Sequence, residues 1–307
     1  MDVGVIGVGT MGKNHVRVYS ELKSVGNLAV CDVNSAAAQA IGKQHNAEVY
    51  PTVEELLKHV DAVNICVPTP FHEDVARKVF DAGVHTFIEK PICATATGAR
   101  ALMVSAPKGI VIGVGHIERF NPIVAEIKKI VTKPQYVELK RHNPTSARVT
   151  GSSVVEDLMI HDIDIVANVF FDHLDRIRSV GNADLCSVQM NAKGVPVVLS
   201  ASRKASKKIR LIYIEDEEFT VEGDFMSQEV TIYRKPGQYR FENERYVQEN
   251  ITEKVMVNKV EPLKVELSAF IDCAKSGRAF PVTPAQAIRN LDICEQIRAG
   301  FNTGANA

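Results

Sequence analysis

The chain has 307 residues and a formal net charge of −1, so bulk electrostatic attraction to nucleic acid or to an anionic membrane is not expected. Its length predicts two domains, and its 45% hydrophobic and 24% charged residues are typical of soluble globular proteins. No apolar run approaches the ~20 residues that cross a bilayer, and no signal-peptide pattern opens the chain. The six cysteines are scattered without a Cys-x-x-Cys pair, which predicts reduced thiols, a cytoplasmic location and no metal or disulfide framework.

A glycine motif follows the first predicted strand. Residues 2–6 form a short apolar stretch, and a helical stretch runs from the motif to about residue 23. Gly7 permits a tight turn, Gly9 lets backbone approach a pyrophosphate, and Gly12 allows the helix to pack closely on the strand. The helix N-terminus would face the phosphates. This context predicts a dinucleotide site built from Gly7, Gly9, Thr10, Met11 and Gly12.

An acidic residue stands at the end of the second predicted strand, residues 28–31. Asp32 follows Gly12 by twenty residues, where a carboxylate would accept hydrogen bonds from the adenosine ribose hydroxyls. A carboxylate there repels a 2′-phosphate, and no Arg or Lys follows until Lys43. The sequence therefore predicts NAD rather than NADP. The alternative is a glycine-rich turn beside a chance aspartate.

Strands and helices keep alternating to about residue 114, which predicts a parallel sheet with helices on both faces. The loops after its strands fall on the carboxyl side of the sheet, where the nicotinamide end of a cofactor would lie. These loops carry the predicted cofactor-binding residues Pro68, Thr69, His72, Glu89 and Lys90. For Thr69 and His72, helix capping is the alternative.

The segment Glu89-Lys90-Pro91 closes the apolar run 84–88, which is predicted to be a buried strand. A charged pair followed by proline is a poor strand end unless the chain turns there. Proline lacks an N–H and pushes Lys90 towards an extended conformation. Lys90 would then lie at the carboxyl edge of the sheet, where open α/β sheets bind ligands. The alternative is an ordinary surface lysine.

The pattern changes after Asn121-Pro122, so we expect one domain at residues 1–120 and another at 121–307, whose C-terminal helix can pack back on the first. Short alternating runs between residues 176 and 251 predict an open, mostly antiparallel sheet of about six strands. One face should pack on a helix over residues 154–171. Self-association would cover the other face and give a homodimer or homotetramer. The predicted fold is α/β in the first domain and α+β in the second.

The predicted helix over residues 154–171 carries a polar stripe. Asp157, His161 and Asp164 are spaced i, i+4, i+7 and so share one face, which Asn168 continues. Polar groups on a buried helix must be paired or must line a cavity. The alternatives to a functional stripe are satisfied buried polar residues, or a metal site, for which no second histidine or cysteine stands at convincing spacing.

Taken together, these motifs resemble the Gfo/Idh/MocA oxidoreductases over essentially the whole chain. The resemblance rests on Gly7/Gly9/Gly12, on Glu89-Lys90-Pro91 and on Asp157-x-x-x-His161. It implies an N-terminal Rossmann domain that binds NAD, and a catalytic group of Lys90, Asp157 and His161 that oxidises an alcohol. His161 suits the general base and Lys90 the developing oxyanion. Lys90 could instead be the base if burial lowers its pKa.

Two shorter strings, residues 115–122 and 157–162, resemble the branch of this family that oxidises the 3-hydroxyl of UDP-N-acetylglucosamine. Bases near these strings would suit a diphosphate. The expected substrate-binding residues are Arg119, Asn121, Arg148, Asp157 and His161, and Lys140, Arg141 and His142 complete the basic cluster. A surface of solvated ion pairs is the alternative for the cluster.

Two other functions stay open within the same family. One is oxidation of inositol or another free polyol, which would not need the basic cluster. The other is a non-catalytic, NAD-binding regulator. A regulator would be expected to lose Lys90 or His161, and both are present.

Overall fold

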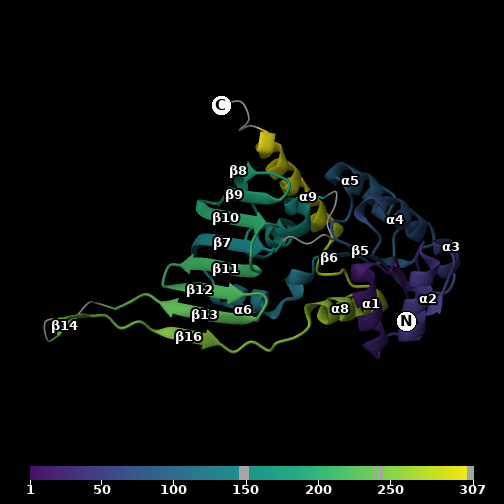
Figure 1. Ribbon diagram of the computed structural model, residues 1–307, viewed down its shortest axis with the longest axis horizontal. Coiled ribbons are helices and arrows are strands. Elements are labelled where there is room, and N and C mark those ends of the chain that lie inside the picture. The colour runs from purple at the N-terminus through teal and green to yellow at the C-terminus, as the bar shows by residue number, and fades with distance from the viewer. Residues whose placement is uncertain (145–151, 238–239, 243–244, 303–307) are drawn as a thin grey trace. The chain divides into compact units, whose positions relative to one another are not determined.

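The computed structural model describes residues 1–144, 152–237, 240–242 and 245–302. The chain divides into two compact units, which are residues 1–120 with 261–292, and residues 121–260 with 293–307 (Figure 1). Each unit encloses a hydrophobic core of its own.

The first unit contains a six-stranded, fully parallel sheet in the order β3-β2-β1-β4-β5-β6. Because the chain runs outwards from β1 on one side and from β4 on the other, the sheet has a switch point beside β1, where open α/β sheets bind ligands. This confirms the predicted parallel, nucleotide-binding architecture. Its strands are β1 (Val3–Ile6), β2 (Leu28–Cys31), β3 (Glu48–Val49), β4 (Ala62–Ile65), β5 (His85–Glu89) and β6 (Ile112–Gly115).

The helices of the first unit begin where the sequence offers caps. Asn34, Thr52 and Thr95 each accept a backbone N–H three residues ahead, which satisfies one of the otherwise unpaired donors of a first turn. The helices are α1 (Thr10–Glu21), α2 (Ser35–His45), α3 (Val53–Leu56), α4 (His72–Asp81), α5 (Ala96–Val104) and α8 (Pro262–Ser276).

The expected domain boundaries, 1–120 and 121–307, are wrong for the segment that contains α8. Residues 261–292 belong to the first unit. Leu263, Leu267 and Phe270 are buried in the core of that unit. The Phe270 ring meets the ring of Phe87 on β5 edge-on, with centroids 5.4 Å apart. Burial of this apolar face, rather than chain order, therefore decides which unit holds α8. The last helix, α9 (Pro284–Ala299), is divided between the units after Asp292.

The second unit contains an open eight-stranded sheet in the order β16-β13-β12-β11-β7-β10-β9-β8 (Figure 1). Only β7 and β10 pair in parallel. The mostly antiparallel sheet is confirmed. Strands β8 to β13 are the approximately six strands expected in this part of the chain, while β7 precedes them and the polar edge strand β16 follows them. The strands are β7 (Pro134–His142), β8 (Asp175–Gly181), β9 (Leu185–Ala192), β10 (Val195–Ser202), β11 (Ile209–Asp216), β12 (Phe219–Asp224), β13 (Glu229–Arg234) and β16 (Thr252–Val255).

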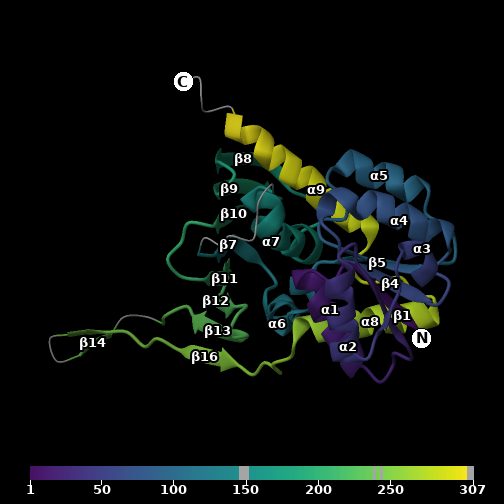
Figure 2. The same cartoon turned by 45° about the vertical axis from the view of Figure 1, so that its right-hand side comes forward.

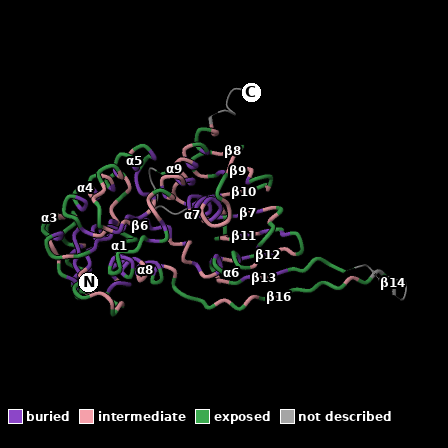
Figure 3. The backbone as a smooth tube through the Cα atoms, turned by 180° about the vertical axis from the view of Figure 1, so that it is seen from behind, coloured by how far each residue is buried: buried purple, intermediate pink, exposed green. Residues whose placement is uncertain are grey.

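Helical segments cover one face of this sheet. The predicted helix over residues 154–171 consists of α7 (Ile160–Ile165) between two π-helical turns, η3 (Val155–Met159) and η4 (Val166–Phe170). It packs over β7 and β10, as Figure 2 shows, and is largely buried (Figure 3). The helix α6 (Pro122–Ile130) packs on β12 and β13. The π-helical turns are a finding that the apolar pattern does not predict, and they often occur at functional sites.

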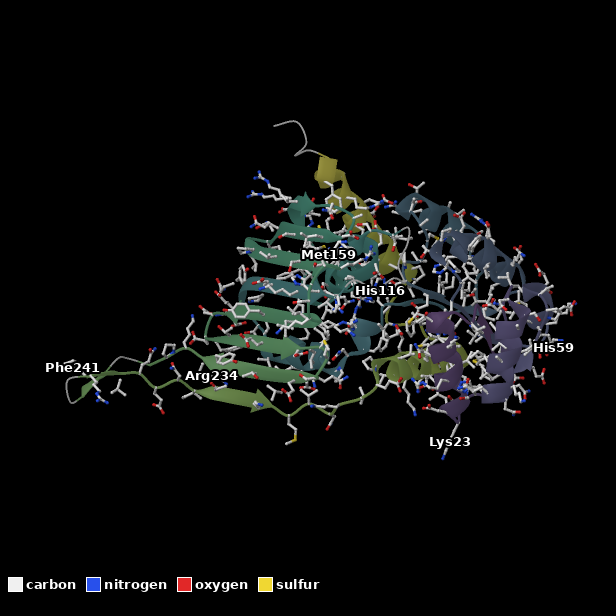
Figure 4. The ribbon with its side chains drawn as sticks, in the orientation of Figure 1. Lys23, His59, His116, Met159, Arg234 and Phe241 are labelled. Carbon is white, nitrogen blue, oxygen red and sulfur yellow. The ribbon has the colours of Figure 1, made fainter. Side chains whose placement is uncertain are left out.

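Between β13 and β16 the chain forms a separate two-stranded hairpin, β14 (Arg240–Glu242) with β15 (Arg245–Val247). It extends beyond the edge of the sheet, with Phe241 near its end (Figure 4). The Phe241 side chain is exposed.

Candidate functional site

The glycine turn after β1 has the backbone geometry that its residues suggested. Gly7 has a φ of 89°, and a Cβ there would lie 2.9 Å from backbone atoms of Cys66. A Cβ on Gly12 would lie 1.9 Å from the Gly7 carbonyl oxygen, so only glycine allows this close packing. No heavy atom of the described residues lies within 4 Å of a Cβ built on Gly9, which suits the approach of a ligand to the turn. Exposed Thr10 and Met11 then begin α1.

The Asp32 carboxylate lies against this turn. One oxygen accepts the Val8 N–H at 2.7 Å, and the other accepts the Asn34 N–H at 2.7 Å. The acid after β2 is thereby fixed beside the turn after β1. These residues fit a dinucleotide, with backbone N–H groups for its phosphates and a carboxylate for its ribose hydroxyls.

The loop after β4 is tied to the loop after β5 by a histidine. His72 is 1% exposed, and its ring nitrogens lie 2.8 Å from the Val67 carbonyl oxygen and 2.9 Å from that of Pro91. Burial lowers the pKa of His72, and the two carbonyls partly offset this effect. In the neutral form the ring can donate to only one of the carbonyls. His72 thus holds the two loops together, while a direct cofactor contact from it stays a prediction, as it does for Pro68 and Thr69.

Lys90 follows the last residue of β5 and is half-buried. The preceding carboxylate is almost fully buried, with one Glu89 oxygen 2.8 Å from His15 Nε2 and the other accepting the Lys90 N–H at 3.1 Å. Burial raises the pKa of Glu89, but the hydrogen bond and electrostatic interaction with His15, followed by the interactions with Lys90, outweigh it, so the pKa is lowered overall. The sequence analysis missed His15, although a lone histidine three residues after Gly12 was a signal.

In the second unit, Asp157 belongs to the π-helical turn η3 and has a charged partner that the sequence analysis missed. Asp157 Oδ2 lies 3.2 Å from Arg203 Nη2. Arg203 follows β10, is 9% exposed and also donates to the Ser152 carbonyl oxygen at 2.8 Å. The carboxylate is therefore held beside the Arg203 guanidinium, which is itself fixed by the Ser152 carbonyl.

The predicted polar stripe separates into two parts. Asp157 and His161 are both half-buried, whereas Asp164 is 1% exposed and accepts a hydrogen bond from the Asn168 amide at 3.0 Å. Asp164 and Asn168 are thus hydrogen-bonded to each other, as expected for polar side chains that are satisfied within the protein. Asp157 and His161 belong to the second unit and Lys90 to the first.

The predicted basic cluster is wrong in one essential member. The Arg141 side chain is buried, and its Nη2 and Nε donate to Asp162 Oδ1 at 2.6 and 2.9 Å. Neighbouring residues of a strand point to opposite faces, and Lys140 pairs instead with Glu138 at 2.9 Å. Arg141 therefore anchors α7 to β7 and cannot serve a diphosphate.

The other predicted substrate contacts differ in their surroundings. Asn121 is 3% exposed, accepts the Ile123 N–H at 3.4 Å and donates to the Phe225 carbonyl oxygen at 3.0 Å, so its amide caps α6 and ties it to the sheet. Arg119 is half-buried in the short helix Ile117–Phe120. Arg148 lies outside the described residues. A substrate contact stays a prediction for Arg119 and Arg148, while the structure gives Asn121 a structural task.

Among the described residues, no group of three or more His, Cys, Asp or Glu could hold a metal ion. In the same part of the chain, no helix has the length and apolar character to cross a membrane.

Comparison with known proteins defines the class. Residues 1–116 match the family described as "Oxidoreductase family, NAD-binding Rossmann fold". The chain is 31% identical over 244 residues to UDP-N-acetylglucosamine 3-dehydrogenase of Acidithiobacillus ferrooxidans, covering 76% of this chain and 77% of that protein. It is 30% identical to inositol 2-dehydrogenase of Rhizobium meliloti, covering 66% and 69%. A solved structure of the Acidithiobacillus ferrooxidans enzyme GnnA superimposes with a TM-score of 0.87 at 28% identity, covering 98% of this chain and 97% of that one.

The fold and the glycine turn with Asp32 thus belong to an NAD-dependent dehydrogenase. The chain is a member of the Gfo/Idh/MocA oxidoreductase family.

Proposed function

We propose that this protein oxidises the 3-hydroxyl of UDP-N-acetylglucosamine to the 3-keto sugar nucleotide, with NAD as the oxidant. The observation that carries the proposal is the 31% identity, over 76% of the chain, to an enzyme named for that reaction. The near-complete superposition on GnnA supports it.

The residues of the chain suit the chemistry. NAD, when bound, accepts the hydride that leaves the carbon. His161 takes the hydroxyl proton, because an imidazole ordinarily titrates near neutral pH. Lys90 donates a hydrogen bond to the developing oxyanion. Asp157, held by Arg203, is suited to accept a hydrogen bond from the sugar or from His161.

Fewer basic residues are proposed to bind the diphosphate than the sequence indicated, because Arg141 forms an ion pair with Asp162. Arg119 and Arg148 remain the proposed partners, and a planar guanidinium suits phosphate oxygens.

The test is NADH absorbance at fixed enzyme concentration with UDP-N-acetylglucosamine, UDP-glucose, N-acetylglucosamine and myo-inositol as separate substrates. A parallel reaction contains 2-oxoglutarate, which can accept the hydride of tightly held NADH, and is followed by the mass of the sugar product, because NADH does not accumulate there; it guards against a false negative. Turnover of UDP-N-acetylglucosamine well above that of the free sugar is expected. Equal rates on free and nucleotide-linked sugar would show that the diphosphate is not recognised.

Oxidation of inositol is the second candidate, favoured by the 30% identity to an inositol 2-dehydrogenase. Turnover of myo-inositol with neither UDP-sugar oxidised would establish it and remove the first proposal.

We also propose a homodimer or homotetramer formed through the sheet face opposite α7, where Leu211 and Tyr233 are each 40% exposed. Light scattering after size-exclusion chromatography tests this, and Leu211→Lys should shift the mass towards the monomer.

The six free cysteines, five of them buried, support a reducing, cytoplasmic setting.

A further inference from the structure

A chain of four hydrogen-bonded polar side chains lies buried behind the Glu89-Lys90-Pro91 turn. The Tyr19 hydroxyl donates to Asn64 Oδ1 at 2.7 Å, Asn64 Nδ2 lies 2.7 Å from His15 Nδ1, and His15 Nε2 lies 2.8 Å from Glu89 Oε1. The four residues come from α1, β4 and β5 and are between 0% and 7% exposed. Polar groups at such depth are costly unless each has a partner, so this arrangement is a specific one.

The direction of each proton along this chain follows from the partners. Burial raises the pKa of Tyr19 well above its usual value, so the phenol keeps its proton and donates it. The Asn64 oxygen accepts this hydrogen bond, so the amide NH₂ faces His15. An NH₂ group cannot accept, so His15 Nδ1 is the acceptor and the ring proton is on Nε2, facing Glu89. The result is an imidazole whose Nδ1 accepts from Asn64 and whose Nε2–H donates to the Glu89 carboxylate.

The far end of the chain is the backbone of Lys90. Glu89 Oε2 accepts the Lys90 N–H at 3.1 Å, so the carboxylate is held by His15 on one oxygen and holds the turn with the other. Across the sheet, Glu89 pairs with Gly115, and a Cβ at that position would lie 3.1 Å from three atoms of the carboxyl group. Gly115 leaves room for this one orientation of Glu89.

We propose that His15 is a positioning residue for Lys90. Supported by Asn64 and Tyr19, it orients the Glu89 carboxylate, which in turn fixes the peptide that leads into Lys90. The inference rests on the proposed role of Lys90 in the reaction. It assigns a task to a buried side chain of the nucleotide-binding unit that is not one of the glycine-turn residues.

The first test compares His15→Leu with His15→Gln. Leucine removes the donor to Glu89, whereas the terminal NH₂ of glutamine can take the place of Nε2–H. His15→Leu should lower kcat on UDP-N-acetylglucosamine by about 10- to 100-fold, the scale of a misplaced catalytic group. KM and the Kd for NAD should change by less than about threefold, and His15→Gln should recover most of kcat.

The control is His85→Leu, because His85 Nδ1 accepts the Val111 N–H at the start of the same strand β5. It loses a hydrogen bond without touching the chain of four and should keep kcat within about twofold. A comparable loss of kcat in this control, or no recovery with His15→Gln, would overturn the inference in favour of general loosening of the strand.

A double variant separates this inference from the proposed function. If His15 acts through Lys90, then His15→Leu combined with Lys90→Met should be no slower than Lys90→Met alone. Losses that multiply would overturn the inference. Wild-type kcat in His15→Leu, with Lys90→Met inactive, overturns the inference alone, whereas full activity of Lys90→Met overturns the proposed function.

A measurement without substrate is the tautomer of His15, read by NMR of protein labelled with ¹⁵N-histidine and assigned with His15→Gln. We expect the ring proton on Nε2, and Tyr19→Phe, which keeps the ring and its packing, should reduce the population of that form. A proton on Nδ1 in the unaltered protein would overturn the proposed proton order. If Tyr19→Phe changes neither the tautomer of His15 nor kcat, the proposed support of His15 by Asn64 and Tyr19 is overturned. This holds even if His15→Leu fails to fold.

Discussion

The Asp157 carboxylate and the Arg203 guanidinium form an ion pair, with Oδ2 and Nη2 3.2 Å apart, although 46 residues separate them in the chain. The Arg203 side chain is 11% exposed and that of Asp157 is 24% exposed, so water screens this pair less than a surface pair. The pair joins the π-helical turn η3 to the end of β10 and holds the Asp157 carboxylate in place. Asp157 can therefore act as a fixed acceptor.

Arg203→Leu should lower the free energy of unfolding by about 2 kcal/mol, because it leaves a partly buried carboxylate without its charged hydrogen bond. It should also lower kcat/KM, while Arg203→Lys should recover part of both losses. Urea unfolding and initial rates measure the two effects. Lys204→Leu is the matched control, because Lys204 pairs with Asp184 at the surface and its loss should cost under about 0.5 kcal/mol. Equal stability of Arg203→Leu and the control would show that the pair is without consequence.

NAD should bind more tightly than NADP, because the Asp32 carboxylate lies beside the glycine turn and repels a 2′-phosphate. Asp32→Ala should narrow the gap between the two cofactors. Calorimetric titration with each cofactor measures it. Asp61→Ala is the control, since Asp61 accepts the Asp2 N–H at the start of β1, and should leave the ratio unchanged. Equal or tighter NADP binding by the unaltered protein contradicts the prediction.

Lys90→Met and His161→Ala should each lower kcat by about 10²-fold or more, the usual scale for groups that transfer or stabilise charge in a reaction. The Kd for NAD should change little, because neither residue belongs to the glycine turn. Lys23→Met, at an exposed lysine after α1, is the control and should keep full activity. Near-normal turnover of His161→Ala across the pH range would show that His161 is not the base.

Glu89 should contribute to stability in a pH-dependent way, since its folded pKa is lowered. That contribution is fully present above the unfolded pKa of about 4.3 and is lost as pH falls through the lower folded pKa. The stability difference between the unaltered protein and Glu89→Gln should therefore shrink as pH falls from about 6 to about 3. Denaturant unfolding at each pH measures it. Glu73→Gln, which removes a surface pair with Arg77, should show a small difference throughout. A Glu89→Gln difference that is constant with pH would contradict the lowered pKa.

The sequence by itself determined the parallel sheet of the nucleotide-binding unit and its glycine turn. The glycines, Asp32 and Glu89-Lys90-Pro91 could be interpreted because each depends on local chemistry, namely a positive φ, a close approach or a residue at the end of a strand. Strand and helix periodicity gave the two sheet types for the same reason, since alternation and helical spacing are properties of neighbouring residues.

Only the tertiary structure decided which polar groups meet. In the sequence, Arg141 resembles a ligand for phosphate, but its position in β7 directs its side chain towards Asp162. No local sequence feature indicates that Arg203 pairs with Asp157 or that His15 pairs with Glu89. The same holds for α8, whose place in the first unit follows from the apolar surface that it buries there. Long-range pairing depends on how strands and helices are brought together in space. A charged side chain that becomes buried needs a partner within the protein, whereas one that stays accessible can bind a ligand.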